Sequence, residues 1–428
     1  MKYGKRLAGF AAATAVATVA LSTPASALDM AEVQRQINAL QAQMNEMKAA
    51  EKKSSGSDLK VKWKGAPQLS SKDGKFKMKV RGRVMADYVN LNDDSGMDRD
   101  ATEFRRARLG VEGIVFKNIK YKFEVDFADN DVDITDAYLQ WKAKPVSLTI
   151  GQQKVPVSLE EQTSSRYITF MERAALTDGF SFSRMIGIAA STGGDNWTVK
   201  AGIFQGDADD GSDEQGRTYA IRATFGPELG NSDAKVHVGA SYFYRENDDD
   251  DGTLRYRQRP PVHIADRYVD TRDMGTDIAG DNDQYFGVEL AGVLGPLSVQ
   301  GEYGWLEADN DLGSNPTFTG GYVDVSYFIT GESRNYKAKK GSFGRVKVKN
   351  PINEGGIGAV QVGVRYDTID LSDNGIDCGE QESWIFGANW HLNNYTRIMA
   401  NYSFTDVDGG SYDGESIDAF AVRFQVDW

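Results

Sequence analysis

The last nine residues alternate strictly between two kinds of side chain, and this constrains the fold more than any other feature of the chain. One face carries Phe420, Val422, Phe424, Val426 and the final Trp428, and the other carries Ala421, Arg423, Gln425 and Asp427. A period of two residues predicts a β-strand with one apolar face. A lone strand of this kind would also fit the edge of a soluble sandwich, so the rest of the chain has to decide.

The same alternation recurs along most of the chain. Sixteen segments show it, at residues 74–91, 103–116, 119–128, 133–142, 146–151, 184–192, 196–204, 217–225, 235–245, 284–293, 296–305, 321–330, 356–368, 382–391, 396–405 and 417–428. Only a closed barrel satisfies every backbone group of such strands in hydrocarbon, and bacterial barrels have an even number of strands. We therefore predict an all-β fold, a 16-stranded antiparallel transmembrane β-barrel over residues 75–428 that ends in an aromatic residue.

The connections between these segments alternate in length. Most of those after even-numbered strands are brief, such as 117–118 and 294–295, whereas those after odd-numbered strands include 152–183 and 246–283. Outer-membrane barrels have short periplasmic turns and long external loops. Both mature termini are therefore expected in the periplasm of a Gram-negative bacterium. The connection after strand twelve, 331–355, is an exception, because it is long although it follows an even-numbered strand.

The first 74 residues divide into three predicted segments. Residues 1–27 read as a signal peptide, with Lys2, Lys5 and Arg6 before an apolar stretch and a small-residue cleavage site. Residues 28–53 predict a coiled-coil helix, because apolar residues recur at spacings of three and four; a solitary amphipathic helix is the alternative. Residues 54–74 are expected to form a linker.

Composition excludes several functions. Acidic residues outnumber basic ones by 62 to 49, which argues against nucleic acid as a partner. The single cysteine, Cys378, cannot form an intrachain disulfide framework, and neither a metal nor a cofactor is expected. The three histidines, His237, His263 and His391, suggest no catalytic set, so we do not expect an enzyme.

Basic residues on the predicted lumen face are the strongest functional signal. The alternation turns Arg81, Arg83, Arg106 and Arg108 inward, with Arg105 beside them, and it does the same for Arg222 and Arg245. Arg255, Arg257 and Arg259 follow at a spacing of two in an external loop. Such a row would favour anions in a narrow pore, since guanidinium groups bind oxyanions bidentately. Pairing with the lumen carboxylates Glu112, Glu124, Asp126 and Asp136 is the alternative.

Two connections carry further basic residues. The loop 152–183 mixes Lys154, Arg166 and Arg173 with apolar residues, so we expect it to fold inward and narrow the pore. A second group is expected at the periplasmic mouth and comprises Lys77, Lys79, Lys337, Lys339, Lys340, Arg345 and Lys347. It could collect anions at the exit, or simply contact anionic lipid headgroups.

Three motifs together resemble the phosphate-selective porin O/P family: Phe104-Arg105-Arg106-Ala107-Arg108-Leu109, the stretch LEEQTSSRYITFMERA at 159–174, and the segment 328–337. The resemblance implies a trimer of 16-stranded barrels with a ladder of arginines. Carried over by motif, Arg105 and Arg106 would form the constriction, and Thr163, Ser164 and Ser165 would lie in the constricting loop. Arg108 stands where the family's phosphate-selective members place an aromatic residue, so it could favour a larger polyanion.

The sequence therefore predicts an outer-membrane porin that passes small anions, phosphate or pyrophosphate first among them, and that contacts outer-membrane lipid and lipopolysaccharide. A general or weakly cation-selective porin is the alternative in the same class. An adhesin or cell-envelope tether is the alternative of another class, and would use the coiled coil and acidic loop runs such as 248–251.

Overall fold

The computed structural model describes residues 30–54, 59–63, 65–208, 216–227, 234–246, 252–272 and 278–428. The predicted signal peptide, 1–27, and the acidic run 248–251 lie outside these residues. The described chain forms two units, one that ends at Asp58 and a second from Leu59 to Trp428.

A single long helix, α1 (Met30–Ser54), accounts for the described part of the first unit. Four of its apolar side chains are 41 to 64% exposed, namely Ile37, Leu40, Met44 and Met47. The helix itself is confirmed, whereas its association into a coiled coil stays a prediction. Neither this helix nor any other in the described ranges has the length and apolar character needed to span a membrane.

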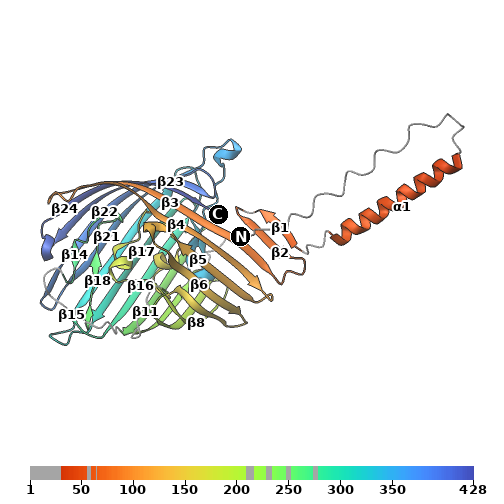
Figure 1. Ribbon diagram of the computed structural model, residues 1–428. Helices are drawn as coiled ribbons and strands as arrows, with labels where there is room; N and C mark the ends of the chain where they lie inside the picture. Colours follow the sequence, from red (N-terminus) through yellow and green to blue (C-terminus); the bar gives the residue numbers. More distant parts are fainter. Residues whose placement is uncertain are drawn as a thin grey trace, which may run out of the picture. The chain divides into compact units, whose positions relative to one another are not determined.

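Sixteen antiparallel strands form the wall of the second unit (Figure 1). They are β3 (Lys77–Asp93), β4 (Arg99–Val115), β5 (Ile119–Asp126), β6 (Asp133–Lys142), β7 (Ser147–Lys154), β8 (Arg184–Gly193), β9 (Trp197–Gln205), β10 (Arg217–Phe225), β11 (Lys235–Glu246), β16 (Asn282–Leu294), β17 (Leu297–Ala308), β18 (Thr317–Phe328), β21 (Ala359–Asp373), β22 (Ile376–His391), β23 (Thr396–Asp408) and β24 (Ser416–Asp427). Each pairs with the next, and β24 pairs with β3 from Ile417 opposite Asp93 to Asp427 opposite Arg83, which closes the barrel. The predicted fold is confirmed.

Burial follows the alternation that the sequence predicts. On β24 the outward side chains Phe420 and Phe424 are 42 and 60% exposed, whereas Arg423 and Gln425 point inward and are 0 and 3% exposed. Such exposed apolar side chains suit a wall that faces lipid.

The predicted linker contains a β-hairpin, which corrects part of that prediction. Strands β1 (Leu59–Trp63) and β2 (Pro67–Ser71) pair with each other, and β2 pairs with β3 from Gln68 opposite Lys79 to Ser70 opposite Lys77. The sheet therefore continues along β3 beyond the residues that pair with β24. Leu59, Val61 and Leu69 show the alternation that is typical of a short pair of strands.

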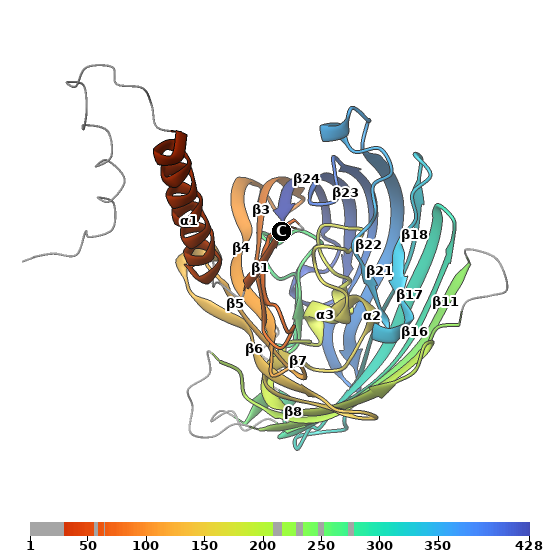
Figure 2. The ribbon, with the colours of Figure 1, turned by 90° about the vertical axis from the view of Figure 1, so that its right-hand side faces the viewer.

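Described parts of three long connections, 155–183, 252–272 and 329–358, contribute residues that are buried against the barrel wall. The loop between β7 and β8 carries the short helices α2 (Leu159–Gln162) and α3 (Ala175–Gly179), which Figure 2 shows within the ring of strands. Other short elements are β12 (Thr253–Leu254), β13 (Arg257–Gln258), β14 (Val269–Asp270), β15 (Ile278–Ala279), β19 (Asn335–Lys337), β20 (Ser342–Gly344) and the 3-10 helices η1 (Ala128–Asn130), η2 (Ala338–Lys340), η3 (Ile352–Glu354) and η4 (Gly410–Tyr412).

The loop 155–183 is bonded to the barrel wall on several strands. Glu160 accepts a hydrogen bond from Arg365 on β21 at 2.6 Å, and the Ala175 amide donates to Asp367 at 3.0 Å. Asn389 on β22 donates to the Thr169 carbonyl at 2.8 Å. The prediction that this loop folds inward is confirmed.

Candidate functional site

A basic cavity of about 550 Å³ lies between the inward loop and strands β3 to β9. Thirteen Lys and Arg side chains line it: Arg81, Arg83, Arg106, Arg108, Lys120, Lys122, Lys154, Arg166, Arg173, Arg184, Lys200, Lys337 and Lys340. Three carboxylates line it, Glu112, Asp136 and Glu161. The excess of positive charge gives this cavity a positive electrostatic potential, which raises the local concentration of anions.

A β-bulge brings two adjacent arginines into the lumen. Opposite β3, Met85 pairs with Arg106 and Ala86 pairs with Phe104, so Arg105 is the extra residue on β4. Phe104 stays outside, 61% exposed, while Arg105 reaches the loop carboxylate Glu172. A regular strand would have placed Arg105 and Arg106 on opposite faces, and bulges redirect a side chain in this way.

The two arginines have different partners. Arg105 makes a bidentate pair with Glu172, at 3.0 Å for both contacts. Arg106 is 6% exposed, and among the described residues it forms no ion pair; its Nη1 lies 3.8 Å from Met85 Sδ and its Nε makes no hydrogen bond. Arg106 therefore has hydrogen-bond donors left for a ligand.

Arg106 also marks the boundary between two cavities. A second cavity of about 160 Å³ includes Arg105 in its lining, together with Arg259 and His263 from the connection between β11 and β16. Both cavities are lined by Arg106, Glu161, Arg173 and Phe182. An anion that crosses from one cavity to the other must pass these four side chains.

Arg108 and Arg83 are held by carboxylates on β5. Arg108 Nε lies 2.6 Å from Asp126, and Arg83 lies 3.2 Å from Glu124 and donates to the Ser165 hydroxyl. These pairs neutralise part of the charge that the sequence assigns to the constriction. Arg108 still lines the basic cavity, as predicted for an inward residue.

The six residues predicted in the constricting loop divide into two kinds. Lys154, Ser164, Ser165, Arg166 and Arg173 line the basic cavity. Thr163 is 1% exposed and binds the Phe343 amide through its hydroxyl at 3.2 Å, so it has a structural contact instead.

Two loop carboxylates are charged partners of these cations. Glu161 lies 2.9 Å from Lys154 and 3.1 Å from Arg173. Burial alone would raise the pKa of Glu161, but Arg173 and Lys154 lower it below its ordinary value. Burial is likewise outweighed at Glu172, where Arg105 and Arg423 hold the pKa well below its usual range. Both carboxylates are therefore ionised at neutral pH.

The predicted arginine ladder is not continuous. Arg222 is paired with Glu289 at 2.6 Å, Arg245 with Asp283 at 2.5 Å, and Arg255 with Asp270. These three arginines and the exposed Arg257 line neither cavity, whereas Arg259 lines the second one. Alternation placed Arg222 correctly inside. Carboxylates on other strands or in the loop bind the paired arginines, which line neither cavity.

The predicted periplasmic cluster is dispersed. Lys337 and Lys340 line the basic cavity, because the connection after β18 folds into the barrel. Burial and Lys337 lower the pKa of Lys340. Lys339 instead pairs with Asp195 at 2.6 Å, and Arg345 pairs with Asp427. Lys77 and Lys347 are exposed, and Lys79 is partly buried; these three do not line either cavity.

Four cavity cations were not singled out from the sequence: Lys120, Lys122, Arg184 and Lys200. Lys120 and Lys122 had a signal, since they alternate with the outward Tyr121 and Phe123. Lys200 lies on β9, and its ammonium group donates to the Lys154 carbonyl at 3.1 Å. Its importance depends on the loop that folds against it, which one strand's pattern cannot reveal.

The family model for phosphate-selective porins O and P matches residues 78–428. The chain belongs to this family. Porin O of Pseudomonas aeruginosa is 31% identical over 422 residues, covering 86% of this chain and 92% of the relative. An uncharacterized protein of Caulobacter vibrioides is 35% identical over 377 residues, covering 84% of this chain and 74% of the relative.

Solved porin structures share the fold of this porin. An anion-selective porin from Comamonas acidovorans superposes with a TM-score of 0.53 at 13% identity, covering 82% of this chain and 100% of that one. The trimer form of OmpT from Vibrio cholerae gives a TM-score of 0.53 at 15% identity, with 82 and 99% covered. Family and barrel together identify an outer-membrane porin, a channel rather than an enzyme.

Proposed function

We propose that this porin passes small inorganic anions, phosphate or pyrophosphate first among them, by passive diffusion through the basic cavity. The observation that carries the proposal is the lining of that cavity, thirteen cations against three carboxylates. Such a lining raises the local concentration of anions and excludes cations.

Arg106 is the proposed selectivity residue. An anion enters the second cavity beside Arg259, crosses at Arg106, and leaves along Lys337 and Lys340. Arg105 and Arg173 stay paired with loop carboxylates. Their role is to position the loop and to add to the positive electrostatic potential of the cavity. Arg106 has no such pair among the described residues, and it can donate to an oxyanion without first breaking one.

Pyrophosphate is favoured by the length of the basic lining. Arg83 and Arg108 lie in the same cavity as Arg106, so cations continue beyond the crossing point. An anion with two charged centres can contact two of these groups at once. Arg108 therefore extends the site toward a larger polyanion.

The assembly and orientation complete the proposal. We infer a homotrimer, like the trimer form of OmpT that shares this fold, inserted in outer-membrane lipid and lipopolysaccharide. Both mature termini would lie in the periplasm after removal of residues 1–27. The short connections 116–118, 143–146 and 295–296 at one end of the barrel support this orientation.

The zero-current potential of the purified protein in a planar bilayer, under a potassium chloride gradient, tests the proposal. We expect chloride to carry most of the current, and added phosphate or pyrophosphate to block it, pyrophosphate at the lower concentration. A cation-selective potential with no block by either anion would contradict the proposal.

A general or weakly cation-selective porin is the second candidate. The ion pairs of Arg222, Arg245 and Arg255 favour it, because these arginines are neutralised by carboxylates. The same bilayer experiment separates the two functions by the sign of the potential.

A tether that works through α1 would instead keep its partner when the pore is blocked and lose it when residues 30–53 are deleted.

A further inference from the structure

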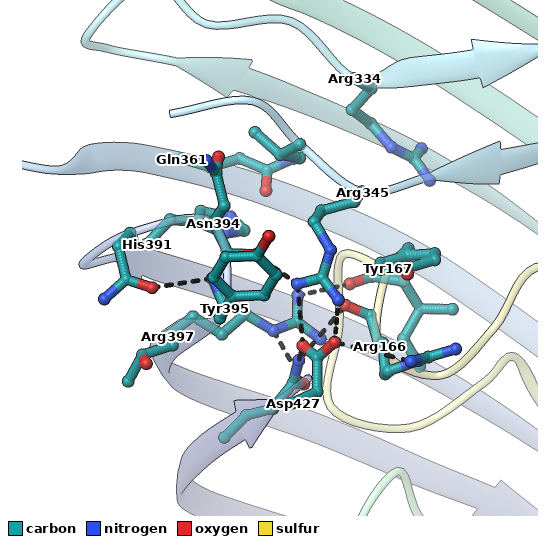
Figure 3. Close-up of a pocket in the computed structure, with 15 residues that line it drawn as sticks. Arg166, Tyr167, Arg334, Arg345, Gln361, His391, Asn394, Tyr395, Arg397 and Asp427 are labelled. Carbon is teal, nitrogen blue, oxygen red and sulfur yellow. Dashed lines mark hydrogen bonds and ion pairs between the residues drawn. The ribbon is translucent and has the colours of Figure 1, made fainter. Parts of the chain in front are cut away.

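A third cavity, small and basic, adjoins the basic cavity and shares Arg166 and Tyr167 with it. It is lined by fifteen residues from the inward loop, the connection after β18 and the strands β21 to β24 (Figure 3). Four of them are arginines, Arg166, Arg334, Arg345 and Arg397, and Asp427 is the single carboxylate in this lining. The cavity measures about 20 Å³.

The one carboxylate is already shared. Arg345 pairs with Asp427 and is stacked between two rings, with its guanidinium carbon 4.6 Å from the centre of Tyr395 and 5.4 Å from that of Tyr167. Arg166 Nη1 lies 3.6 Å from the same carboxylate. Asp427 therefore balances at most one of these two charges.

Arg397 adds a second unbalanced charge. It is 3% exposed and donates to three neutral acceptors, namely Gln425 at 3.0 Å, the Ile168 carbonyl at 2.8 Å and the Ser165 carbonyl at 3.3 Å. Among the described residues it has no ion pair. Beside it, His391 is 8% exposed and its Nε2 makes no hydrogen bond.

A buried excess of cations without counter-charge is costly, since each loses its hydration. The void exceeds the ~10–15 Å³ that one water molecule needs. It is therefore large enough for one small ion and offers no enclosed room for an organic group. Its chemistry is that of guanidinium donors, which bind anions.

We propose that this cavity is a structural binding site for one halide-sized anion, chloride under ordinary conditions. The anion lies where the inward loop, through Arg166, meets the connection after β18, through Arg345, and the wall, through Arg397. Its occupancy fastens these three parts to one another. The site borders the basic cavity through Arg166 and Tyr167, and the proposal does not rest on the proposed function.

Bromide tests the site, because its anomalous diffraction locates it directly. Crystals of the full-length protein grown in sodium bromide should show an anomalous peak among Arg166, Arg345 and Arg397, and the peak should remain when phosphate is added. No peak in this cavity, or phosphate density there in place of bromide, would overturn the proposal.

We expect two variants to change the bromide occupancy of the cavity in opposite directions. Arg397→Gln removes a cation and should weaken the bromide peak, whereas Asp427→Asn removes the competing carboxylate and should raise its occupancy. If Arg397→Gln does not fold, Asp427→Asn still decides, because a peak that is lost with Asp427 would contradict the proposal. Arg217→Gln, an exposed position on β10, is the control and should leave the peak unchanged.

The midpoint of heat unfolding gives a second readout. At constant ionic strength, replacing gluconate with chloride should raise the midpoint of the wild type and of Arg217→Gln, but not that of Arg397→Gln. An equal rise in all three would mean that chloride acts elsewhere. The bromide peak reports on anion binding in this cavity, whereas the zero-current potential in bilayers reports on conduction, so failure of this site and failure of the proposed function are distinguishable.

Discussion

At the scale of single residues, the contrast between Arg105 and Arg106 is central. They are neighbours in sequence, and a bulge aims both inward, yet Glu172 neutralises only Arg105. Their positions could be predicted from alternation and from the family motif. The partner of Arg105 could not, because Glu172 is 67 residues away on a loop whose path depends on the whole barrel.

The first prediction concerns Arg106→Gln. Hydrogen bonds to charged groups contribute about 1.5–3 kcal/mol, so the phosphate concentration needed for half-block should rise roughly 10- to 150-fold. Block of chloride current in a bilayer measures it. Arg217→Gln is the control, and an Arg106→Gln channel that is blocked like the wild type would refute the assignment of Arg106.

The second prediction concerns Glu172 and pH. Glu172→Gln leaves Arg105 without a neutralising partner, so the ratio of chloride to potassium permeability should rise at pH 7. Because the pKa of Glu172 lies well below its usual range of about 4.5, the wild-type carboxylate stays charged at pH 5. The stabilisation that it contributes is present above pH 4.5 and is lost only as pH falls through the lower folded value.

The difference in permeability ratio between wild type and Glu172→Gln should therefore be equal at pH 7 and pH 5. Other carboxylates that titrate in this range affect both proteins alike, so the variant is its own control. Convergence of the two proteins by pH 5 would mean that Glu172 is protonated with an ordinary pKa.

At the scale of elements, the loop 155–183 depends on a buried network on the barrel wall. Arg365 is 0% exposed and lies 2.6 Å from Glu160 on α2 and 3.0 Å from Asp324 on β18. The apolar residues of this loop indicated that it folds inward, because they need a core. The strands that receive it were not predictable, since its hydrogen bonds reach residues up to 259 positions away.

The third prediction is that Arg365→Met releases the loop. Removing one partner of a buried ion pair costs about 3–5 kcal/mol, because the other charges stay buried without compensation. We expect a larger single-channel conductance, weaker anion selectivity and faster trypsin cleavage after Arg166 and Arg173. The triple change Arg365→Met, Glu160→Gln and Asp324→Asn removes the unbalanced charges and should restore much of the wild-type conductance. An Arg365→Met channel with wild-type conductance and cleavage would contradict this role.

At the scale of the whole molecule, the barrel was predictable because apolar and polar side chains alternate along each strand, with the apolar ones facing lipid. Pairing of β24 with β3 could be expected from this alternation without knowledge of any particular side-chain contact. The filling of the lumen does not follow from it. Residues Val89, Leu91, Ile417 and Ala419 face inward and are buried, because long connections between strands pack against them. The conducting space is thus confined to one part of the barrel.

The final prediction separates this barrel from the unit that precedes it. The residues that line the basic cavity span Arg81 to Gly344, and all of them follow α1 and the β1–β2 hairpin. Deleting Met30–Lys53 should therefore leave ion selectivity and phosphate block unchanged. If the exposed apolar residues of α1 form a coiled coil between copies, the same deletion should lower the temperature at which trimers dissociate on a gel. Changing Ile37, Leu40 and Met44 together to Gln should lower it equally while the helix is kept. Altered selectivity after the deletion would mean that the first unit contributes to the pore.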